Sequence, residues 1–548
     1  MARGAVLPWA DPRQQQALPE MAAPTAQQRG AAEPAPNSAA PLPDAARPKP
    51  EDWQARAVSP ESWWLGAIGA PLFSSHAVPL SAQSLVMQTL QHSFQIRVDA
   101  ATPRLEQTRI VEAAAEFDWN ALVTGTWRDT SDPVGSLLDT NGARFRREHY
   151  LTEAGLRRRN LQGGDLSVTQ NLGYENTNSQ FFSPPHQGQT QLLLRYDQPL
   201  LRGRGTLVNR STIVLAELET SRADGEFLSR LQQRLRDVVA TYWDLYVARG
   251  ELVIQQRLVM QAERVSDQLR LRENVDGSVE QLLRAGGAVE SRRGDLLNAR
   301  RAVLDLQARL RNLVNSPELS QCETTEFLIT DEPARELVPS NQSGAFAMAM
   351  SNRPDFAAAM QELRQAAVRN QVADNDLLPD LKLVLESYVK GLRGESDIAD
   401  AFAAQFKEGE PSYSVGFQWQ AALGRRADRA AKLRASLEVA QAQDRLQVQT
   451  EQIWLEVGNA VRQLHTAYQR VARQRSAMLQ FSRELHLLTK RRELLPPRGQ
   501  NGSLLLTDLL NSQDRLADAE RRYLRSRADY ALALIELQRS MGTLTATR

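Results

Sequence analysis

Two stretches of this chain, residues 207–272 and 426–492, contain no proline and repeat apolar residues at helical spacing. Helices of 66 and 67 residues would each be about 100 Å long, because an α-helix rises about 1.5 Å per residue. No globular core is that deep, so each helix must pack along its length against other helices. In the first stretch the apolar residues are spaced by three and four, as in a coiled-coil seam: Leu228, Leu231, Leu235, Val238, Tyr242, Leu245 and Leu252. The sequence therefore predicts two long coiled-coil arms.

The second stretch repeats the seam of the first. Its apolar residues are Trp454, Val457, Val461, Leu464, Tyr468 and Val471. A shift of 219 residues superposes them on the first seam from Leu235 onward, with Arg249 as the one polar exception. Each arm is followed by a turn and a returning helix, at 274–279 with 280–315 and at 495–502 with 503–540. We therefore predict an internal duplication in which each half contains one long helical hairpin.

Four short runs alternate between apolar and polar residues, two before each arm: DWNALVTGTW (118–127), TQLLLRYDQPL (190–200), DLKLVLESYVK (380–390) and SYSVGFQWQA (412–421). Such strands suit a soluble sandwich, and equally a membrane barrel with a water-filled lumen. Four strands cannot close a barrel alone, since the smallest barrels have about eight. Because open sheet edges are unfavourable in lipid, membrane-spanning strands of this chain require several chains to share one barrel.

The chain divides into three parts. Residues 1–79 are predicted to be a disordered tail rich in proline and alanine, with eleven prolines in the first 60 residues and no recognisable secretory signal. Residues 80–345 form a first repeat with a helix, a strand pair and a hairpin, and residues 346–548 form a second repeat of the same kind. Within the first repeat, 130–188 is long for one connection and predicts either extra strands or an extended surface loop.

Composition and motifs argue against several function classes. A net charge of +1 gives no reason to expect nucleic-acid binding. The single cysteine, Cys322, excludes an intramolecular disulfide and a thiolate metal cluster. The six histidines show no ligand spacing, and no Ser–His–Asp or Cys–His arrangement is present. No apolar run approaches the roughly 20 residues of a membrane-spanning helix. We therefore predict no catalytic residues, no metal and no cofactor, and a protein that is not an enzyme.

The segment YDQPLLRGRG (196–205) joins a strand to a helix through two glycines, which is where a dinucleotide-binding fingerprint would lie. The third glycine of that fingerprint is missing, because Val208 occupies its position, and no acidic residue closes the unit. The second repeat has only Gly424 at the same place. A bend between strand and helix is therefore the better interpretation, formed by Pro199, Gly203, Gly205 and Gly424, with Asn209 or Ser211 capping the helix.

The order of elements resembles the outer-membrane efflux proteins of the TolC family over about residues 80–545. Three stretches carry the resemblance: YDQPLLRGRGTLVNRSTIVLA (196–216), RPDFAAAMQELRQAAVRNQVADNDLLPDLKL (353–383) and NGSLLLTDLLNSQDRLADAERRYLRSRADYALALIELQRSMGTL (501–544). It implies a mostly α, α+β fold with duplicated helical hairpins and four strands per chain. It also implies a homotrimer whose twelve strands form one barrel in outer-membrane lipid, continued across the periplasm by the helices.

By the same resemblance, the expected function is that of a passive duct of a tripartite efflux or type I secretion system. A periplasmic adaptor protein and an inner-membrane pump are the implied partners, and the helical tips are the implied gate. In this family an acidic pair after the second hairpin turn commonly lines the constriction. The matching positions are Asp508 and Asn511, and the repeat places Gln281 and Arg284 at the equivalent site. Arg284 could pair with Asp508 of a neighbouring copy.

Two alternatives use the same features. A periplasmic adaptor also joins helical hairpins to β modules, although it has one hairpin where this chain has two in tandem. A cytosolic coiled-coil scaffold accounts for the helices but leaves the four strands unexplained.

Overall fold

The computed structural model describes residues 63–73, 76–134, 140, 142, 144–271, 279–320, 325–494 and 500–545. These residues belong to one unit, Arg56–Arg548. Most of the predicted N-terminal tail, Cys322 and the two hairpin turns at 272–278 and 495–499 lie outside them. No helix in the described part combines the length and the apolar content that crossing a membrane requires.

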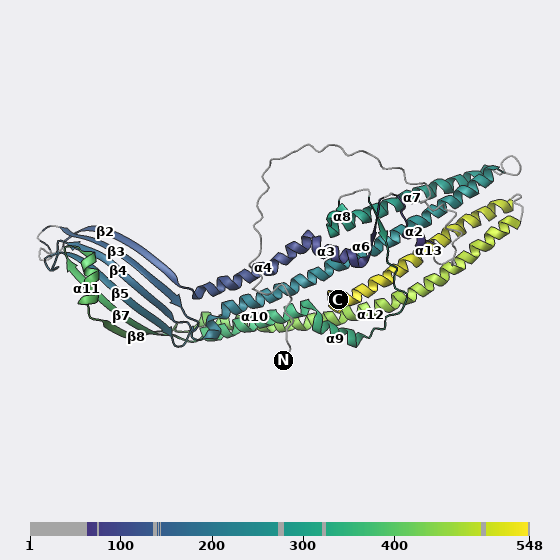
Figure 1. Cartoon of the computed structure of the whole chain (residues 1–548). Coiled ribbons are helices and arrows are strands. Elements are labelled where there is room, and N and C mark those ends of the chain that lie inside the picture. The colour runs from purple at the N-terminus through teal and green to yellow at the C-terminus, as the bar shows by residue number, and fades with distance from the viewer. Residues whose placement is uncertain are drawn as a thin grey trace, which may run out of the picture. The chain divides into compact units, whose positions relative to one another are not determined.

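Two long helical hairpins form the framework. Helix α6 (Ser211–Leu271) is followed by α7 (Val279–Val314), and α12 (Arg426–Leu494) is followed by α13 (Gln500–Ser540). Both predicted hairpins are confirmed to within a few residues. Helix α13 packs against α6 as well as against α12, so the two hairpins lie side by side (Figure 1).

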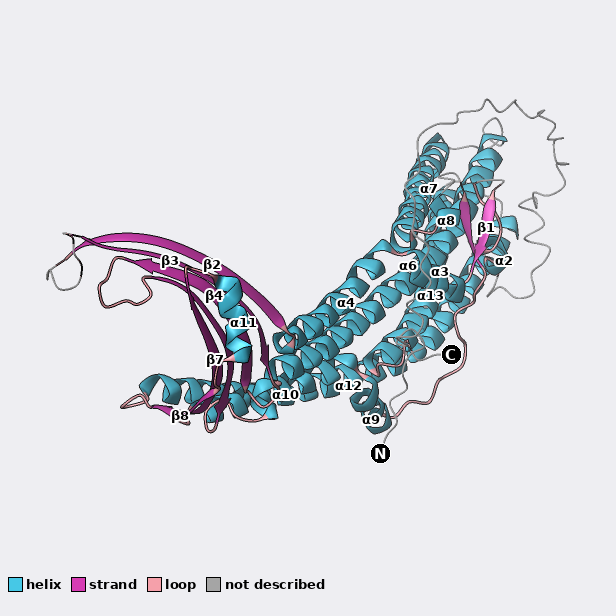
Figure 2. Ribbon diagram, turned by 60° about the vertical axis from the view of Figure 1, so that its left-hand side comes forward, coloured by secondary structure: helices cyan, strands magenta, loops and turns pink. Residues whose placement is uncertain are grey.

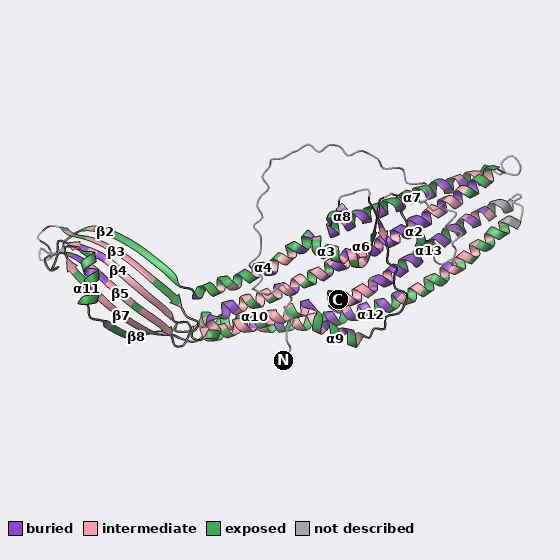
Figure 3. Ribbon diagram, viewed as in Figure 1, coloured by how far each residue is buried: buried purple, intermediate pink, exposed green. Residues whose placement is uncertain are grey.

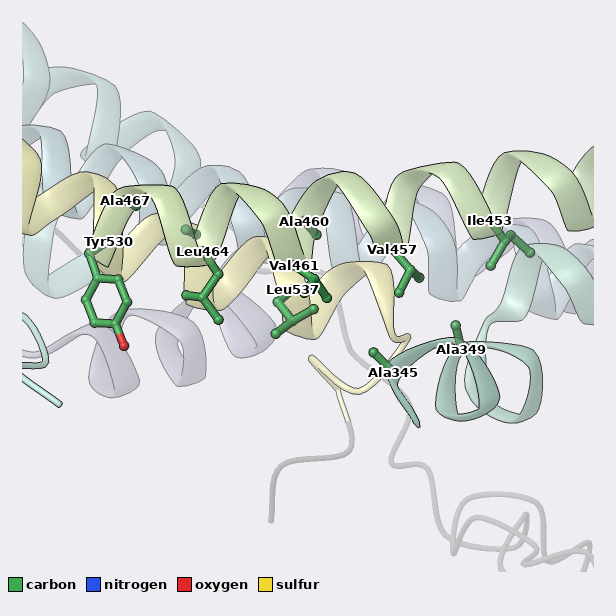
Figure 4. Close-up of a cluster of buried hydrophobic side chains, with 11 residues drawn as sticks. Ala345, Ala349, Ile453, Val457, Ala460, Val461, Leu464, Ala467, Tyr530 and Leu537 are labelled. Carbon is green, nitrogen blue, oxygen red and sulfur yellow. The ribbon is translucent and has the colours of Figure 1, made fainter. Parts of the chain in front are cut away.

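The predicted seams supply the core. In α6 the seam is buried at Leu235, Val238, Tyr242 and Leu245. In the second repeat, Val457 and Leu464 of α12 pack with Leu537 of α13 and Ala345 of α9 (Gln342–Asn352), as Figure 4 shows. Burial is concentrated along the helices, whereas the sheet is mostly half-buried or exposed (Figure 3).

A six-stranded antiparallel sheet forms one curved layer at the other end of the hairpins from their tips (Figures 1 and 2). Its order is β2 (Asn120–Pro133), β3 (Arg144–Arg159), β4 (Asp165–Thr177), β5 (His186–Pro199), β7 (Asp380–Gly394) and β8 (Ser412–Gln420). The expectation of four strands is wrong, because β3 and β4 occupy the segment 130–188. In β3 (RFRREHYLTEAGLRRR) charged residues obscure the apolar alternation.

The two repeats contain the same break between helices. Helix α3 (Ala82–His92) has eleven residues and is followed by Ser93 and α4 (Phe94–Ala114), and a 3₁₀ turn (Ala115–Phe117) then leads to β2. Helix α9, also of eleven residues, is followed by Arg353 and α10 (Pro354–Asp376). Ser93 and Arg353 have nearly the same backbone angles, φ −63° and ψ 118° against φ −73° and ψ 123°. This shared geometry supports the predicted duplication.

A small parallel sheet packs against α6 near its middle. It consists of β1 (Ala77–Leu80) and β6 (Glu326–Ile329), with α2 (Leu65–Ile68) before it and α8 (Pro317–Ser320) nearby. Trp64 and Ile68 are at most 2% exposed. The prediction of a disordered tail as far as residue 79 is therefore wrong for residues 63–73 and 76–79, which are held by tertiary burial and not by a local pattern.

Arg249, the polar exception in the first seam, holds this N-terminal segment in place. Its Nη1 lies 2.6 Å from Glu326 Oε1, and both side chains are at most 1% exposed. Its Nε and Nη2 donate to the carbonyls of Ile68 and Ala70, at 2.8 and 2.7 Å. Glu326 in turn accepts from the backbone N–H of Leu72. Paired and hydrogen-bonded in this way, a buried charge can be accommodated.

Candidate functional site

The six-stranded sheet has two chemically distinct faces. Residues that pair across neighbouring strands point to the same side of a sheet. One side, the apolar face, carries Val123 and Trp127 of β2, Tyr150, Ala154 and Leu156 of β3, Leu166, Val168, Leu172 and Tyr174 of β4, Leu192, Leu194 and Tyr196 of β5, Leu381, Leu383 and Leu385 of β7, and Tyr413, Val415, Phe417 and Trp419 of β8.

The opposite side, the polar face, carries ionised and amide side chains with a few apolar ones between them. Arg195 lies 3.0 Å from Asp197 and 3.1 Å from Glu386 on this side. Arg147 and Glu175 form another pair at 2.6 Å. Moving these ionised side chains from water into hydrocarbon would be unfavourable even though they are paired, so the polar face suits contact with water and not with lipid.

Aromatic residues border the apolar face at both ends of the strands. Trp127, Tyr150 and Tyr174 stand in register on three adjacent strands, and the two tyrosine rings stack at 5.6 Å. At the helix end, Trp119 and Trp419 are 50% and 62% exposed. Trp127 is eight positions after Trp119, which is about 26 Å along the strand at 3.3 Å per residue, or about 20 Å of height at a strand tilt of about 40°. Transmembrane barrels have an apolar band of similar height, about 25 Å, between their aromatic girdles.

Helix α11 (Ile398–Lys407), which the sequence analysis missed, lies against the sheet (Figure 2). It contacts Thr190, the cross-strand partner of Leu172, and is therefore on the apolar face. Thr190 Oγ1 donates to the carbonyl of Ala401 at 3.0 Å, and a Cβ at Gly391 would overlap that carbonyl. The side chains turned away from the sheet are Phe402 and Phe406, 42% and 59% exposed and stacked edge to face at 5.3 Å. A helix on a protein in water normally buries its phenylalanines and exposes its alanines. Here the order is reversed.

The joint between sheet and helices uses left-handed glycines. Strand β5 ends at Pro199, Gly203 and Gly205 have φ of +79° and +102°, and the short α5 (Thr206–Asn209) leads into α6. Gly424, with φ of +102°, occupies the same place between β8 and α12. Non-glycine residues rarely adopt these angles, so the bend requires glycine there.

Neither predicted capping residue caps the helix. Asn209 Nδ2 donates to the carbonyls of Gly203 and Gly205, both at 2.8 Å, and its Oδ1 accepts from Arg159 at 2.8 Å. Ser211 Oγ donates back to the carbonyl of Val208. The asparagine amide is engaged by the loop, so it is not available to the helix N-terminus. Arg159 is the last residue of β3, and the sequence analysis did not place this strand end at the joint.

Near the helical tips the two hairpins touch. Gln281 is buried, whereas Asp508 and Asn511 are exposed one helical turn apart on α13. Arg284 lies 2.6 Å from Glu280 and donates to Thr507 Oγ1 at 3.2 Å, next to Asp508 in the same chain. Pairing of Arg284 with a neighbouring copy stays a prediction.

A second arginine joins the hairpins, and sequence reasoning missed it. The side chain of Arg292 is 6% exposed, and it bonds Gln513 at 2.9 Å and Asp514 at 2.8 Å. In the returning helices the repeats are related by a shift of 227 residues, which aligns Leu283 with Leu510 and Leu310 with Leu537. By that shift the equivalent of Arg292 is the buried Ala519. That replacement of an apolar residue by arginine was the available signal. Among the described residues, no group of three or more His, Cys, Asp or Glu side chains could hold a metal ion.

No protein-family model and no curated protein matches the chain. Solved structures do. The outer membrane protein VceC of Vibrio cholerae matches with 15% identity and a TM-score of 0.59 over 84% of this chain and 96% of its own. The MtrE outer membrane channel of Neisseria gonorrhoeae, in its open state, matches with 16% identity and a TM-score of 0.59 over 84% of this chain and 88% of its own. The CmeC outer membrane channel of Campylobacter jejuni matches with 12% identity and a TM-score of 0.62 over 87% of this chain and 91% of its own. The chain therefore has the fold of these outer membrane channels.

Proposed function

We propose that this protein is the outer-membrane channel of a tripartite efflux or type I secretion system, a passive duct from the periplasm to the exterior. The observation that carries the proposal is the two-faced sheet continuing into two long hairpins, in the fold of known outer membrane channels. The apolar face contacts outer-membrane lipid and the polar face lines a water-filled lumen. The hairpins extend the lumen into the periplasm.

Helix α11 supports this assignment of the two faces. Its exposed phenylalanines, Phe402 and Phe406, are stable in hydrocarbon and unfavourable in water. Because α11 lies on the apolar face, that face is the one in contact with lipid. The charged pairs around Arg195 then face the lumen, where water solvates them.

Three copies assemble in this proposal, and a periplasmic adaptor protein and an inner-membrane pump supply energy and substrate. The tips close the inner end, with Asp508 and Asn511 of the second hairpin and Gln281 and Arg284 of the first at the constriction. The contact of Arg284 with Thr507 supports it, because it brings both sets of residues to one place. The protein performs no catalytic step of its own.

The test combines location with a matched pair of substitutions. We expect the protein in the outer-membrane fraction as a detergent-extracted trimer whose gel mobility changes on heating. Val123→Arg on the apolar face, four residues from both Trp119 and Trp127, should reduce the folded trimer, because arginine in the middle of a bilayer costs about 2–4 kcal/mol on a barrel's lipid side. Thr124→Arg, one residue on and facing the lumen, is the control and should be tolerated. A soluble monomer or dimer, as expected of an adaptor, contradicts the proposal, and equal effects of the two variants contradict the assignment of the faces.

A further inference from the structure

We infer that the membrane barrel is built from eighteen strands, six from each of three copies, and is closed by strand β2 of one copy pairing with strand β8 of the next. The inference rests on the proposed function, which supplies the trimer and the membrane. It differs from the twelve strands that the resemblance implies, and the difference comes from β3 and β4.

Strands β3 and β4 have the properties of wall strands. They have 16 and 13 residues, more than the roughly 9–11 that a tilted strand needs to span a bilayer. Their pairing is continuous with β2 on one side and with β5 on the other. Tyr150 and Tyr174 continue the aromatic row that begins at Trp127. An extracellular hairpin standing in water would gain nothing from that row.

The turn between β3 and β4 is fixed at the helix end of the sheet. Gln162 accepts from the backbone N–H of Gly205 at 3.2 Å, and Arg159 donates to Asn209 at 2.8 Å. A Cβ at Gly163 would overlap the carbonyl of Gly203. The hairpin therefore crosses the whole height of the wall and docks on the joint between barrel and tunnel.

The sheet leaves two edges that complement each other. Strand β2 pairs with β3 and strand β8 with β7, and no other pairing partner of either lies among the described residues. Strand β2 begins at the helix end and β8 finishes there, so β2 of one copy meets β8 of the next in the antiparallel sense of every other pair in the sheet. Six strands are fewer than the roughly eight of the smallest barrels, and open edges are not tolerated in lipid. The occupant of each edge is therefore a second copy of this chain.

The extra strands widen the lumen. Barrel diameter grows roughly linearly with strand number, so eighteen strands make a lumen about 1.5 times as wide as twelve, with roughly twice the cross-section. In a trimer only twelve long helices continue the duct, because each chain supplies α6, α7, α12 and α13. The helical tips, and not the barrel, then set the limit on what passes.

Cysteine pairs on the polar face test the wall in the membrane-extracted protein, with Cys322→Ala as background. Thr124 pairs with Glu153 of β3, and the same row continues to Gln191 of β5. We expect Thr124→Cys with Glu153→Cys to form a disulfide within one chain. We expect Thr124→Cys with one of Ser414→Cys, Gly416→Cys or Gln418→Cys to give a covalent ladder that ends at the trimer.

The other outcomes separate the inference from the proposed function. A disulfide between Thr124→Cys and Gln191→Cys, with none to Glu153→Cys, means a twelve-stranded wall with the β3–β4 hairpin outside it. That result overturns the inference and leaves the channel intact. A ladder that ends at the dimer, or a trimer with no link between β2 and β8, also overturns it. A chain absent from the outer membrane overturns the proposed function instead. A strand count by electron cryomicroscopy of the trimer is the independent check.

Discussion

Position 249 of helix α6 holds a buried arginine, whereas the equivalent position of α12 holds Tyr468. Arg249 binds Glu326 and the carbonyls of the N-terminal segment. Tyr468 packs with Tyr530 of α13, ring centroids 5.6 Å apart, in an apolar cluster. The first repeat thus uses the position to hold a distant segment of the chain, and the second uses it to hold its own hairpin together.

At the breaks between helices it is the second repeat that carries the arginine, Arg353, whereas the first carries Ser93. Ser93 is 1% exposed, and its Oγ has no hydrogen-bond partner among the described residues. Arg353 is 8% exposed and binds Asp355 at 2.6 Å and Glu456 at 2.7 Å. The same backbone geometry is therefore stabilised by an ion network in one repeat and by simple burial in the other. In a duplicated chain, a charged residue in one repeat at a position where the other repeat has an apolar or small residue marks a contact that only the repeat with the charged residue makes.

Removing the arginine that only the first repeat has should produce the largest effect. Arg249→Met removes the arginine that pairs with the buried Glu326, and breaking one side of a buried pair costs about 3–5 kcal/mol. The matched control, Tyr468→Met, exchanges one large apolar side chain for another and should cost less than about 1.5 kcal/mol. The measurement is the temperature at which the detergent-extracted protein loses its folded gel mobility.

A double variant tests whether the loss of stability comes from the buried carboxylate of Glu326. Adding Glu326→Gln to Arg249→Met removes the carboxylate charge that Arg249 balances in the wild type, so part of the lost stability should return. Equal destabilisation by Arg249→Met and Tyr468→Met means that the pair does not distinguish the two repeats.

The joints are the next place to separate the repeats. Gly163→Ala should cost about 2–4 kcal/mol, because a left-handed residue is strained and the new methyl group forces the backbone of the joint to move. Gly424→Ala, also at positive φ but in open space, should cost only about 1–2 kcal/mol. Denaturant midpoints of the two folded variants give the comparison. A smaller loss at Gly163 than at Gly424 shows that the β3–β4 turn is not anchored on the joint.

The long helices could be predicted from sequence because their signal is local and repeated. Seam residues such as Leu235 and Val457 recur at helical spacing, and no proline interrupts them. Strand β3 could not be predicted with the same security, since its arginines and glutamates mask the alternation that its neighbours show. Residues 63–73 read as tail because their order depends on burial of Trp64 against distant helices, which no local pattern reveals.

The candidate site divides along the same line. Gly203, Gly205 and Gly424 were recognisable because a bend after a strand needs left-handed residues, and the structure gives all three positive φ. The role of Asn209 could not be recognised from the sequence, because its partners Gly203 and Arg159 come together only in the folded chain. Arg292 was visible only as a departure from the repeat.

The ion pairs of Arg353, at the break between α9 and α10, predict that the stability there depends on pH. The break at Ser93 has no such ion pairs in the described structure and should show no such dependence. Burial acts to raise the pKa of Asp355, but the hydrogen bonds and charge of Arg353 outweigh it and hold the pKa below its ordinary value of 3.8. A lowered carboxyl pKa contributes stability above the unfolded value, and that stability is lost as the pH falls through the folded one. Asp355→Asn should therefore cost about 1.5–3 kcal/mol at neutral pH.

That cost should shrink as the pH falls below the ordinary carboxyl value of 3.8 and through the lower folded pKa of Asp355, because the wild-type carboxyl is then itself losing its charge. Ser93→Ala, at the equivalent break, is the control and should change stability little at either pH, since no bond is lost. Thermal midpoints at neutral and acid pH decide the matter. A constant difference between Asp355→Asn and wild type across that range contradicts the assignment.

The tips give the smallest expected effect, because their charges are exposed and screened by salt. The second tip carries Asp508 with a neutral Asn511, and the first carries Arg284, so the two repeats bring opposite signs to the proposed constriction. Asp508→Asn should lower, and Asn511→Asp should raise, the preference for cations over anions, each by roughly two- to five-fold at low salt, equivalent to about 0.4–1 kcal/mol per ion. Reversal potentials of single channels in a salt gradient measure this.

Asp514→Asn, on the same helix but paired with Arg292, is the control and should leave selectivity unchanged while loosening the contact between hairpins. If Asp508→Asn and Asn511→Asp shift the reversal potential in the same direction, or not at all in open channels, the acidic tip does not line the path and the constriction lies elsewhere along the helices.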